Sequence, residues 1–213
     1  QTFPNWPATL NNFRFRWSAA EGIDLTSGPA VPLRAFMESN QLIYKTLSIT
    51  AAYPGYQRAV PYPPWKLGTN WPSVYKIDNP NDVELRNRDQ IEFGNRYYRI
   101  MQITPQGNGF RAVVCWFAPA RYARTDDGRY ELLGPAYHQQ PEPDLHAVDF
   151  TQRDPRSGPN PPPPPAGPQE GPLPAPVDDV FSNWIFTAVS LSQLTWWYNN
   201  GQDSTDIPPE YKP

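Results

Sequence analysis

The chain has 213 residues, of which 38% are hydrophobic and 14% aromatic, and its formal net charge is −3. Eight tryptophans and twelve tyrosines exclude a wholly disordered chain, because aromatic rings bury large apolar surfaces. The 29 prolines amount to roughly three times the usual share of about 5%, which indicates long, stiff loops.

Charge is distributed unevenly along the chain. Residues 1–156 carry 17 basic and 15 acidic side chains, whereas residues 157–213 carry one base, Lys212, and six acids. An acidic end beside a slightly basic body predicts that this end docks on its own body or on a basic partner. Nucleic-acid binding is not expected, because the acidic end repels phosphate and the body has no dense basic run.

The sequence also predicts a location outside the cytoplasm, secreted or in the cell envelope. The chain opens at Gln1 without an initiator methionine or signal peptide, as a product processed after export would. No stretch reaches the roughly 18 apolar residues of a membrane span, so membrane association is expected only through a partner or a removed N-terminal segment. Fourteen arginines against four lysines are typical of GC-rich bacterial genomes.

The first predicted elements are a strand and a long helix. Phe13, Phe15 and Trp17 alternate with polar residues, which indicates a half-buried strand. Residues 31–52 are then expected to form a helix, because apolar residues recur at helical spacing and Pro32 suits a first helical turn. Pro54 and Gly55 are expected to end it.

An irregular connection rich in proline and aromatic residues follows over residues 53–82. Ordered loops of this length are usually functional, and its rings and cations can line a face that binds sugar, glycan or peptide. The alternative is a loop that packs on itself and covers one side of the sheet. The candidate ligand-binding residues are Tyr53, Tyr56, Arg58, Tyr62, Trp65 and Trp71.

A section rich in β-strands is predicted next. Residues 95–117 are expected to form a hairpin in which Gly107 and Gly109 have positive φ, and Asp127–Gly128 predicts the turn of a second hairpin. Residues 144–151 are expected to add an edge strand. The order of elements predicts an α+β fold, a long helix packed on a curved antiparallel sheet, in a core domain of residues 1–153.

A Pro-rich arm over residues 154–179 and an anchor segment with an acidic tail over residues 180–213 complete the predicted organisation. Eleven prolines between Pro155 and Pro176 predict either a disordered spacer or a polyproline II rod, which at about 3.1 Å per residue can cross the domain or reach a neighbour. The anchor is too apolar to stay exposed. Asp178 or Asp179 as a cap and Gly201 as a stop favour a helix over residues 180–199, although its residue types also suit a strand.

The arm and anchor, residues 157–199, are expected to bind a protein partner or a second copy, or to dock on their own domain. The predicted partner-binding residues are Trp184, Ile185, Phe186, Leu191, Leu194, Trp196, Trp197 and Tyr198.

No catalytic signature stands out, so whether the chain is an enzyme is left open, with a non-catalytic role favoured. Asp144 and His146 are expected on one face of a strand with Asp149 nearby, as an acid–base pair, as part of a metal site or, more simply, as a polar edge strand. Cys115 lies in an apolar run and is expected to be a small core residue rather than a nucleophile. No cofactor and no metal site are predicted, because two separated histidines cannot make a zinc site alone.

Residues 95–132, with their "NRYYRIMQIT" and "FRAVVCWF" strands and the tyrosine-bearing hairpin, resemble the sheet of envelope-associated proteins of mycobacteria and their relatives. Together with the preceding helix, they are similar to the cone-shaped fold of the nuclear-transport-factor-2-like superfamily. The resemblance covers residues 30–135 and implies an exported, non-enzymatic protein. It does not cover the long Pro-aromatic loop or the C-terminal arm.

Three functions follow from these observations. The first is an exported, non-catalytic assembly or scaffold protein that uses its arm and anchor. The second is a domain that binds a small apolar ligand or glycan, in a pocket between the helix of residues 32–50 and the sheet of residues 96–117. The third is a structural subunit of a virion or filament.

Overall fold

The computed structural model describes residues 6–46, 48–60, 92–118, 121–132, 143–152, 176 and 178–190. The predicted α+β class is confirmed. The helical elements are η1 (Ala8–Leu10), α1 (Ala30–Thr46), η2 (Ile49–Ala51) and α2 (Tyr56–Ala59). The strands are β1 (Asn12–Ala19), β2 (Glu92–Gln106), β3 (Gly109–Phe117), β4 (Arg121–Arg124), β5 (Tyr130–Leu132), β6 (Asp144–Thr151) and β7 (Ile185–Ser190). None of the helices in these ranges has the length and apolarity that crossing a membrane requires.

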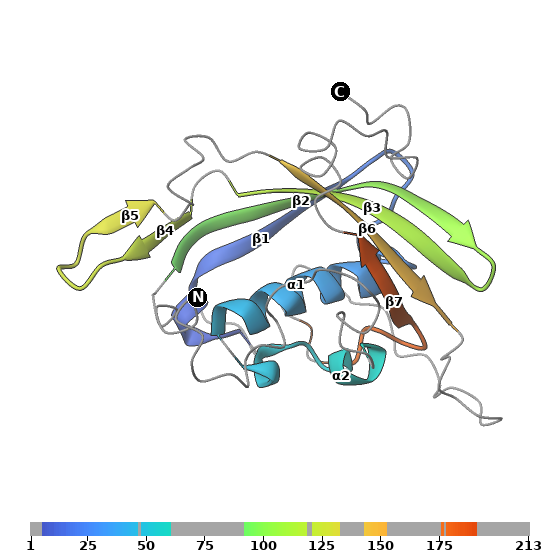
Figure 1. Cartoon of the computed structure of the whole chain (residues 1–213), viewed down its shortest axis with the longest axis horizontal. Coiled ribbons are helices and arrows are strands. Elements are labelled where there is room, and N and C mark those ends of the chain that lie inside the picture. Colours follow the sequence, from blue (N-terminus) through green and yellow to red (C-terminus); the bar gives the residue numbers. More distant parts are fainter. Residues whose placement is uncertain are drawn as a thin grey trace.

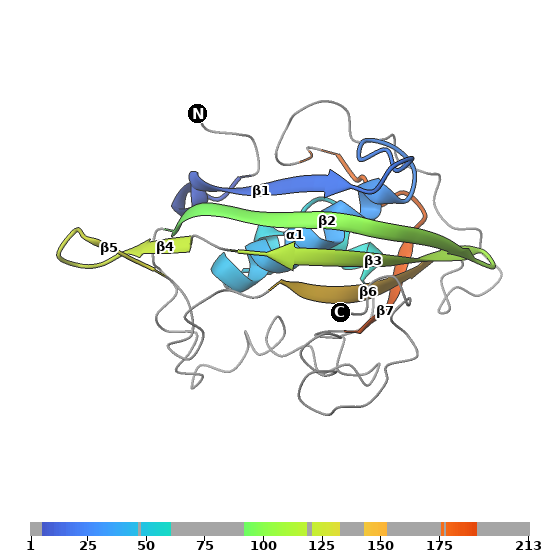
Figure 2. The same ribbon diagram turned by 90° about the horizontal axis from the view of Figure 1, so that it is seen from above.

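Seven strands of the described chain form one sheet, whose body runs in the order β1-β2-β3-β6-β7 (Figure 2). β4 pairs with the first residues of β2, and β5 pairs with β4. This short hairpin therefore extends beyond the body of the sheet (Figure 1). Gly128 lies in its turn and has φ 83°. The hairpin at Asp127–Gly128 forms as predicted.

The sheet is mixed, so the expectation of a wholly antiparallel sheet is wrong. β1 pairs with β2 in parallel, with Phe13 opposite Gly94 and Trp17 opposite Tyr98. Parallel neighbours need a crossover connection, and α1 lies in the stretch that joins these two strands. The alternation of apolar and polar residues in β1 could not predict the parallel pairing, because parallel and antiparallel strands alternate in the same way.

The core lies between one face of the sheet and the helices, and Figure 1 shows α1 and α2 on the same side of the sheet. Leu33, Phe36 and Met37 of α1 are buried against Phe13 of β1 and Ile100 of β2. We call this the inner face and the opposite one the outer face. The alternation of Phe13, Phe15 and Trp17 with arginines in β1 follows directly from this one-sided burial.

Helix α1 ends earlier than the sequence pattern predicted. Thr46 is its last residue, and the Thr46 hydroxyl donates to the Leu42 carbonyl at 2.8 Å. The separate turn η2 follows, with the Ser48 hydroxyl accepting from the Thr50 amide at 3.3 Å as its N-terminal cap. Serine and threonine compete for backbone groups in this way, which explains why the helix stops eight residues before Pro54.

The β2–β3 hairpin forms as expected, with a correction at one glycine. Gly107 has φ 58°, whereas Gly109 does not have a positive φ. A Cβ atom at Gly109 would collide with the Phe150 carbonyl of β6. Gly109 therefore permits the close approach of two strands rather than an unusual backbone conformation.

Two expectations about the end of the fold are also wrong. β6 is not an edge strand, because it lies between β3 and β7. Residues 185–190 form a strand, not part of a helix, and they pair antiparallel with β6. An open edge of β6 can pair with Ile-, Val- and Thr-rich chain, and this tertiary partner outweighs the capping signals at the ends of the segment.

Candidate functional site

The most distinctive part of the structure is the seat of residues 178–190, the first part of the predicted anchor. We call these residues the docking segment. Its strand β7 extends the sheet of residues 12–151, with Phe186 opposite Phe150 and Ile185 opposite Thr151. The docking segment is therefore an integral part of the core domain, in which residues 1–153 were expected to be complete.

Phe186 is the centre of this seat. Its ring stacks on Phe36 of α1, with ring centroids 4.4 Å apart, and makes an edge contact with Phe150 of β6 at 6.1 Å. Phe181 meets the edge of Tyr56 of α2 at 6.1 Å. Burial of a phenylalanine stabilises by about 1.5–3 kcal/mol, so these two buried rings make a large contribution to holding the segment in its seat.

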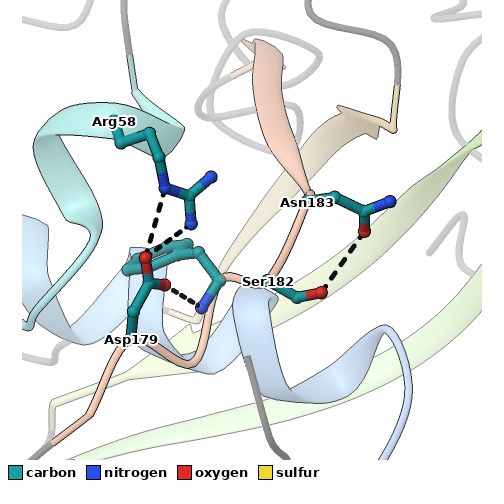
Figure 3. A network of polar contacts seen from close by, with 5 residues as sticks. Arg58, Asp179, Ser182 and Asn183 are labelled. Atoms are coloured by element: carbon teal, nitrogen blue, oxygen red, sulfur yellow. Dashed lines mark hydrogen bonds and ion pairs between the residues drawn. The ribbon is translucent and has the colours of Figure 1, made fainter. Parts of the chain in front are cut away.

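A polar contact fixes the start of the docking segment on α2 (Figure 3). The Arg58 guanidinium donates to one Asp179 carboxylate oxygen from Nη2 at 2.7 Å and from Nε at 3.2 Å. The other Asp179 oxygen accepts from the Phe181 amide at 2.9 Å. Gly55 lies beneath this carboxylate, and a Cβ atom there would overlap it.

The Arg58–Asp179 contact determines position more than stability. The two side chains are 30% and 33% exposed, so water and salt screen their attraction. A pair of this kind contributes about 0–1 kcal/mol. Because Asp179 also bonds the backbone of Phe181, the contact sets where the aromatic residues of the segment enter the core.

A buried carboxylate lies elsewhere on the inner face. The Glu38 side chain of α1 accepts a hydrogen bond from Trp17 Nε1 at 2.6 Å and another from the Tyr53 hydroxyl. Burial raises the pKa of Glu38 to about 7, although Arg34 one turn earlier and the two hydrogen bonds oppose the shift. Burial, and then the neighbouring Glu38, also raise the pKa of Tyr53 well above its ordinary value.

A second polar cluster joins α1 to three strands. The buried Arg96 donates to the Gln41 side chain, and its guanidinium lies over the Trp116 ring, 3.9 Å from the centroid. Trp116 Nε1 in turn donates to His146 Nε2 at 2.6 Å. Glu38, Tyr53, Arg96 and His146 are buried, and their contacts with Trp17, Gln41 and Trp116 help to hold α1 on the sheet.

His146 therefore does not belong to an acid–base group with Asp149. His146 points to the inner face, whereas Asp149 binds Arg111 on the outer face through two contacts of 2.8 Å. Residues three apart in a strand point to opposite faces. Among the described residues, no group of three or more His, Cys, Asp or Glu side chains could hold a metal ion.

The outer face carries a shallow groove of about 300 Å³ across β1, β2 and β3. Arg16, Tyr97, Arg99, Cys115 and Phe117 are among its lining residues. Cys115 is only partly buried here, so the prediction that it is a core residue is wrong: the alternation of β3 places Ala112, Val114 and Trp116 inside instead.

The three candidate ligand-binding residues that the structure describes do not line an open site. Tyr53 and Tyr56 are buried, where their hydroxyls donate to Glu38 and to Asn40, the latter at 2.6 Å. Arg58 binds the docking segment. Tyr62, Trp65 and Trp71 lie outside the described residues.

The predicted partner-binding residues divide in the same way. Ile185 and Phe186 are buried in the core of the chain, and Trp184 is half-buried at 4.9 Å from Phe110. Neither Ile185 nor Phe186 is exposed to a partner in this arrangement. Leu191, Leu194, Trp196, Trp197 and Tyr198 lie outside the described residues, as do residues 154–175 and 177 of the Pro-rich arm.

Sequence reasoning missed Asp179 as a ligand of Arg58, and Glu38 and Arg96 as buried charges. Asp178 or Asp179 suits a helix cap, and nothing in the sequence around Asp179 indicates a partner 121 residues away. One signal was available for Glu38. It occupies a helix position beside Met37 and the helical apolar stripe, where a lone acid among apolar residues suggests a buried carboxylate.

Comparisons with protein-family models, curated proteins and solved structures found no match for this chain.

Proposed function

We propose that this chain is a non-catalytic assembly module that exchanges its docking segment with a second copy of itself. The observation that carries this proposal is the length of the connection between β6 and β7. Thr151 and Ile185 are register partners on adjacent strands, yet 33 residues, 152–184, join them. A hairpin needs only about 2–5 residues for such a connection.

The composition of the connection supports exchange. Eleven prolines lie between residues 155 and 176. Twenty-two residues in polyproline II conformation extend roughly 65–70 Å, whereas adjacent strands are only about 5 Å apart. A Pro-rich connection that is far longer than its own hairpin needs is well suited to carry β7 to the open β6 edge of a neighbour.

The seat has the properties that exchange requires. The docking segment brings two buried rings, a strand and the Asp179 carboxylate, and each meets a partner on α1, α2 or β6. The same contacts form whether the segment comes from the same chain or from a second one. Exchange therefore joins copies through contacts that can also form within one chain, and it needs no additional interface.

We further propose that the module acts outside the cytoplasm. This part of the proposal is supported by the resemblance to exported mycobacterial envelope proteins. It is tested by locating the protein in fractions of its host cells, where recovery only in the cytoplasm would contradict it.

Charge reversal across the Arg58–Asp179 pair tests the exchange. Each single variant, Arg58→Asp or Asp179→Arg, places like charges together and should weaken docking by on the order of 1–3 kcal/mol. If segments are exchanged, refolding the two variants together restores the pair across chains: a mixed dimer appears by light scattering and its melting temperature returns toward the wild-type value.

The double variant Arg58→Asp/Asp179→Arg is the matched control, because it restores the pair in either arrangement. Wild-type protein that stays monomeric at all concentrations, or single variants that do not complement each other while the double variant recovers, would show that the segment docks only in its own chain. Either result would overturn the proposed exchange.

A further inference from the structure

The acidic, aromatic tail that follows β7 has a complementary surface in the outer groove. We propose that residues 191–213 dock on this groove, on the same domain that receives the preceding β7. The inference rests on the proposed function in one respect: because the tail is joined to β7, the domain that receives β7 also receives the tail.

The groove offers rings and cations in two rows across the strands. Strand register places Arg16, Tyr97 and Phe117 in one row, and Ser18, Arg99 and Cys115 in the next. Tyr97 is 44% exposed, an unusually open position for a large ring in the middle of a sheet. Arg99 is also exposed. The Arg16 guanidinium donates a hydrogen bond from Nε to Asn95 Oδ1 at 2.9 Å.

The outer face beside the groove is apolar. Val113, Leu145 and Ala147 lie on the outer face, because they alternate with the inner-face residues Val114, His146 and Val148. Nevertheless they are only 8%, 6% and 9% exposed. These residues form an apolar strip next to Cys115 at the end of the groove.

The tail starts at this place. Ser190, the last residue of β7, pairs with Ala147 of β6. Two strand spacings, roughly 10 Å, separate β7 from β3, and the tail of 23 residues can span several times that distance. A chain leaving Ser190 therefore reaches the groove without strain.

The chemistry of the tail matches that of the groove. Trp196, Trp197 and Tyr198 supply rings that can stack on guanidinium groups and on Tyr97. Asp203, Asp206 and Glu210 then outnumber the single base Lys212, opposite Arg16 and Arg99. An aromatic segment followed by acids is the composition that an apolar groove with a basic rim binds.

Cys115 provides a reporter, because it is the only cysteine of the chain and lines the groove. We expect iodoacetamide to alkylate Cys115 slowly in the full-length protein. In the variant Trp196→Ser/Trp197→Ser the rate should rise by about tenfold, since undocking exposes the thiol. Addition of a synthetic peptide of residues 191–213 should then slow the reaction again.

Two controls make the result specific. Trp65→Ser/Trp71→Ser removes the same number of tryptophans from residues 61–91 and should leave the rate unchanged. Asp203→Asn/Asp206→Asn should raise the rate, whereas Asp126→Asn/Glu131→Gln, on the β4–β5 hairpin, should not. Circular dichroism confirms that each variant is folded.

An unchanged rate in a folded Trp196→Ser/Trp197→Ser variant would overturn the proposal, as would a rise of equal size in the Trp65→Ser/Trp71→Ser control. The test is independent of segment exchange. A monomeric protein with a protected Cys115 would refute exchange and support tail docking. If instead the charge-reversal variants form a mixed dimer and Cys115 reacts equally fast in the wild type and in Trp196→Ser/Trp197→Ser, exchange would be supported and tail docking refuted.

Discussion

At the scale of single residues, Glu38 carries the main electrostatic consequence of the fold. Its carboxyl is buried between Trp17 and Tyr53, and its pKa rises from 4.5 to about 7. Between these two pH values the folded chain binds the proton more tightly than the unfolded chain does. The corresponding stabilisation is complete below pH 4.5 and is lost as the pH rises through about 7.

Replacement of Glu38 by glutamine should remove this pH dependence. The amide keeps the size of the carboxyl and its acceptor oxygen but cannot ionise. From pH 5 to pH 8 the wild type should lose on the order of 3 kcal/mol of unfolding free energy through this group, and Glu38→Gln should lose correspondingly less. Urea unfolding at both pH values measures the difference.

The exposed Glu21 provides the control for this experiment. Glu21→Gln should follow the pH dependence of the wild type. Parallel curves for the wild type and Glu38→Gln would show that Glu38 does not titrate in this range.

At the scale of elements, the docking segment depends on a backbone position in another element. Gly55 precedes α2 with φ 84°, and the Asp179 carboxylate occupies the place of its missing side chain. The glycine thus has two roles, a left-handed conformation and room for the segment. Gly22 has nearly the same φ of 82° but no atom within 4 Å of its Cβ position.

The comparison of Gly55→Ala with Gly22→Ala separates these two roles. Gly22→Ala should cost only the backbone strain, about 1–2 kcal/mol. Gly55→Ala should cost about 1–3 kcal/mol more, because the methyl group displaces Asp179. Unfolding free energies from chemical denaturation measure both. In an Asp179→Ala background the excess should disappear; equal costs at the two glycines would refute the role assigned to Gly55.

At the scale of the whole molecule, the sheet is completed by chain that follows the Pro-rich stretch. Without β7 the β6 edge is open, and Phe36, Phe110 and Phe150 lose Phe186 or Trp184. Loss of a buried phenylalanine costs about 3–5 kcal/mol, a large part of the roughly 5–15 kcal/mol that stabilises a domain.

A chain that ends at residue 153 should therefore fail to form a stable monomer. We expect it to aggregate or to bind a hydrophobic dye, as measured by light scattering and dye fluorescence. A chain that ends at Ser190 keeps β7 and should remain folded. A soluble, cooperatively folding monomer of residues 1–153 would contradict the role of β7 in the core.

Local patterns were sufficient where an element depends on its own residues. The alternation of Phe13, Phe15 and Trp17 predicted β1, and the glycines at 107 and 128 predicted two hairpins. Local patterns failed where the structure of a segment depends on a partner far away in the sequence. The parallel pairing of β1, the strand at 185–190 and the Arg58–Asp179 contact each depend on chain far away in the sequence.

The sequence by itself therefore determined the α+β class, the inward face of β1 and the presence of a helix after it, because periodicity and turn residues act over a few positions. Only the tertiary structure decided the use of the docking segment. Whether 185–190 is helix or strand depended on the open edge of β6, and whether Asp179 is a cap or a ligand depended on Arg58 and Gly55. Such choices follow from packing between segments that are remote in the sequence, and local propensities carry no information about that packing.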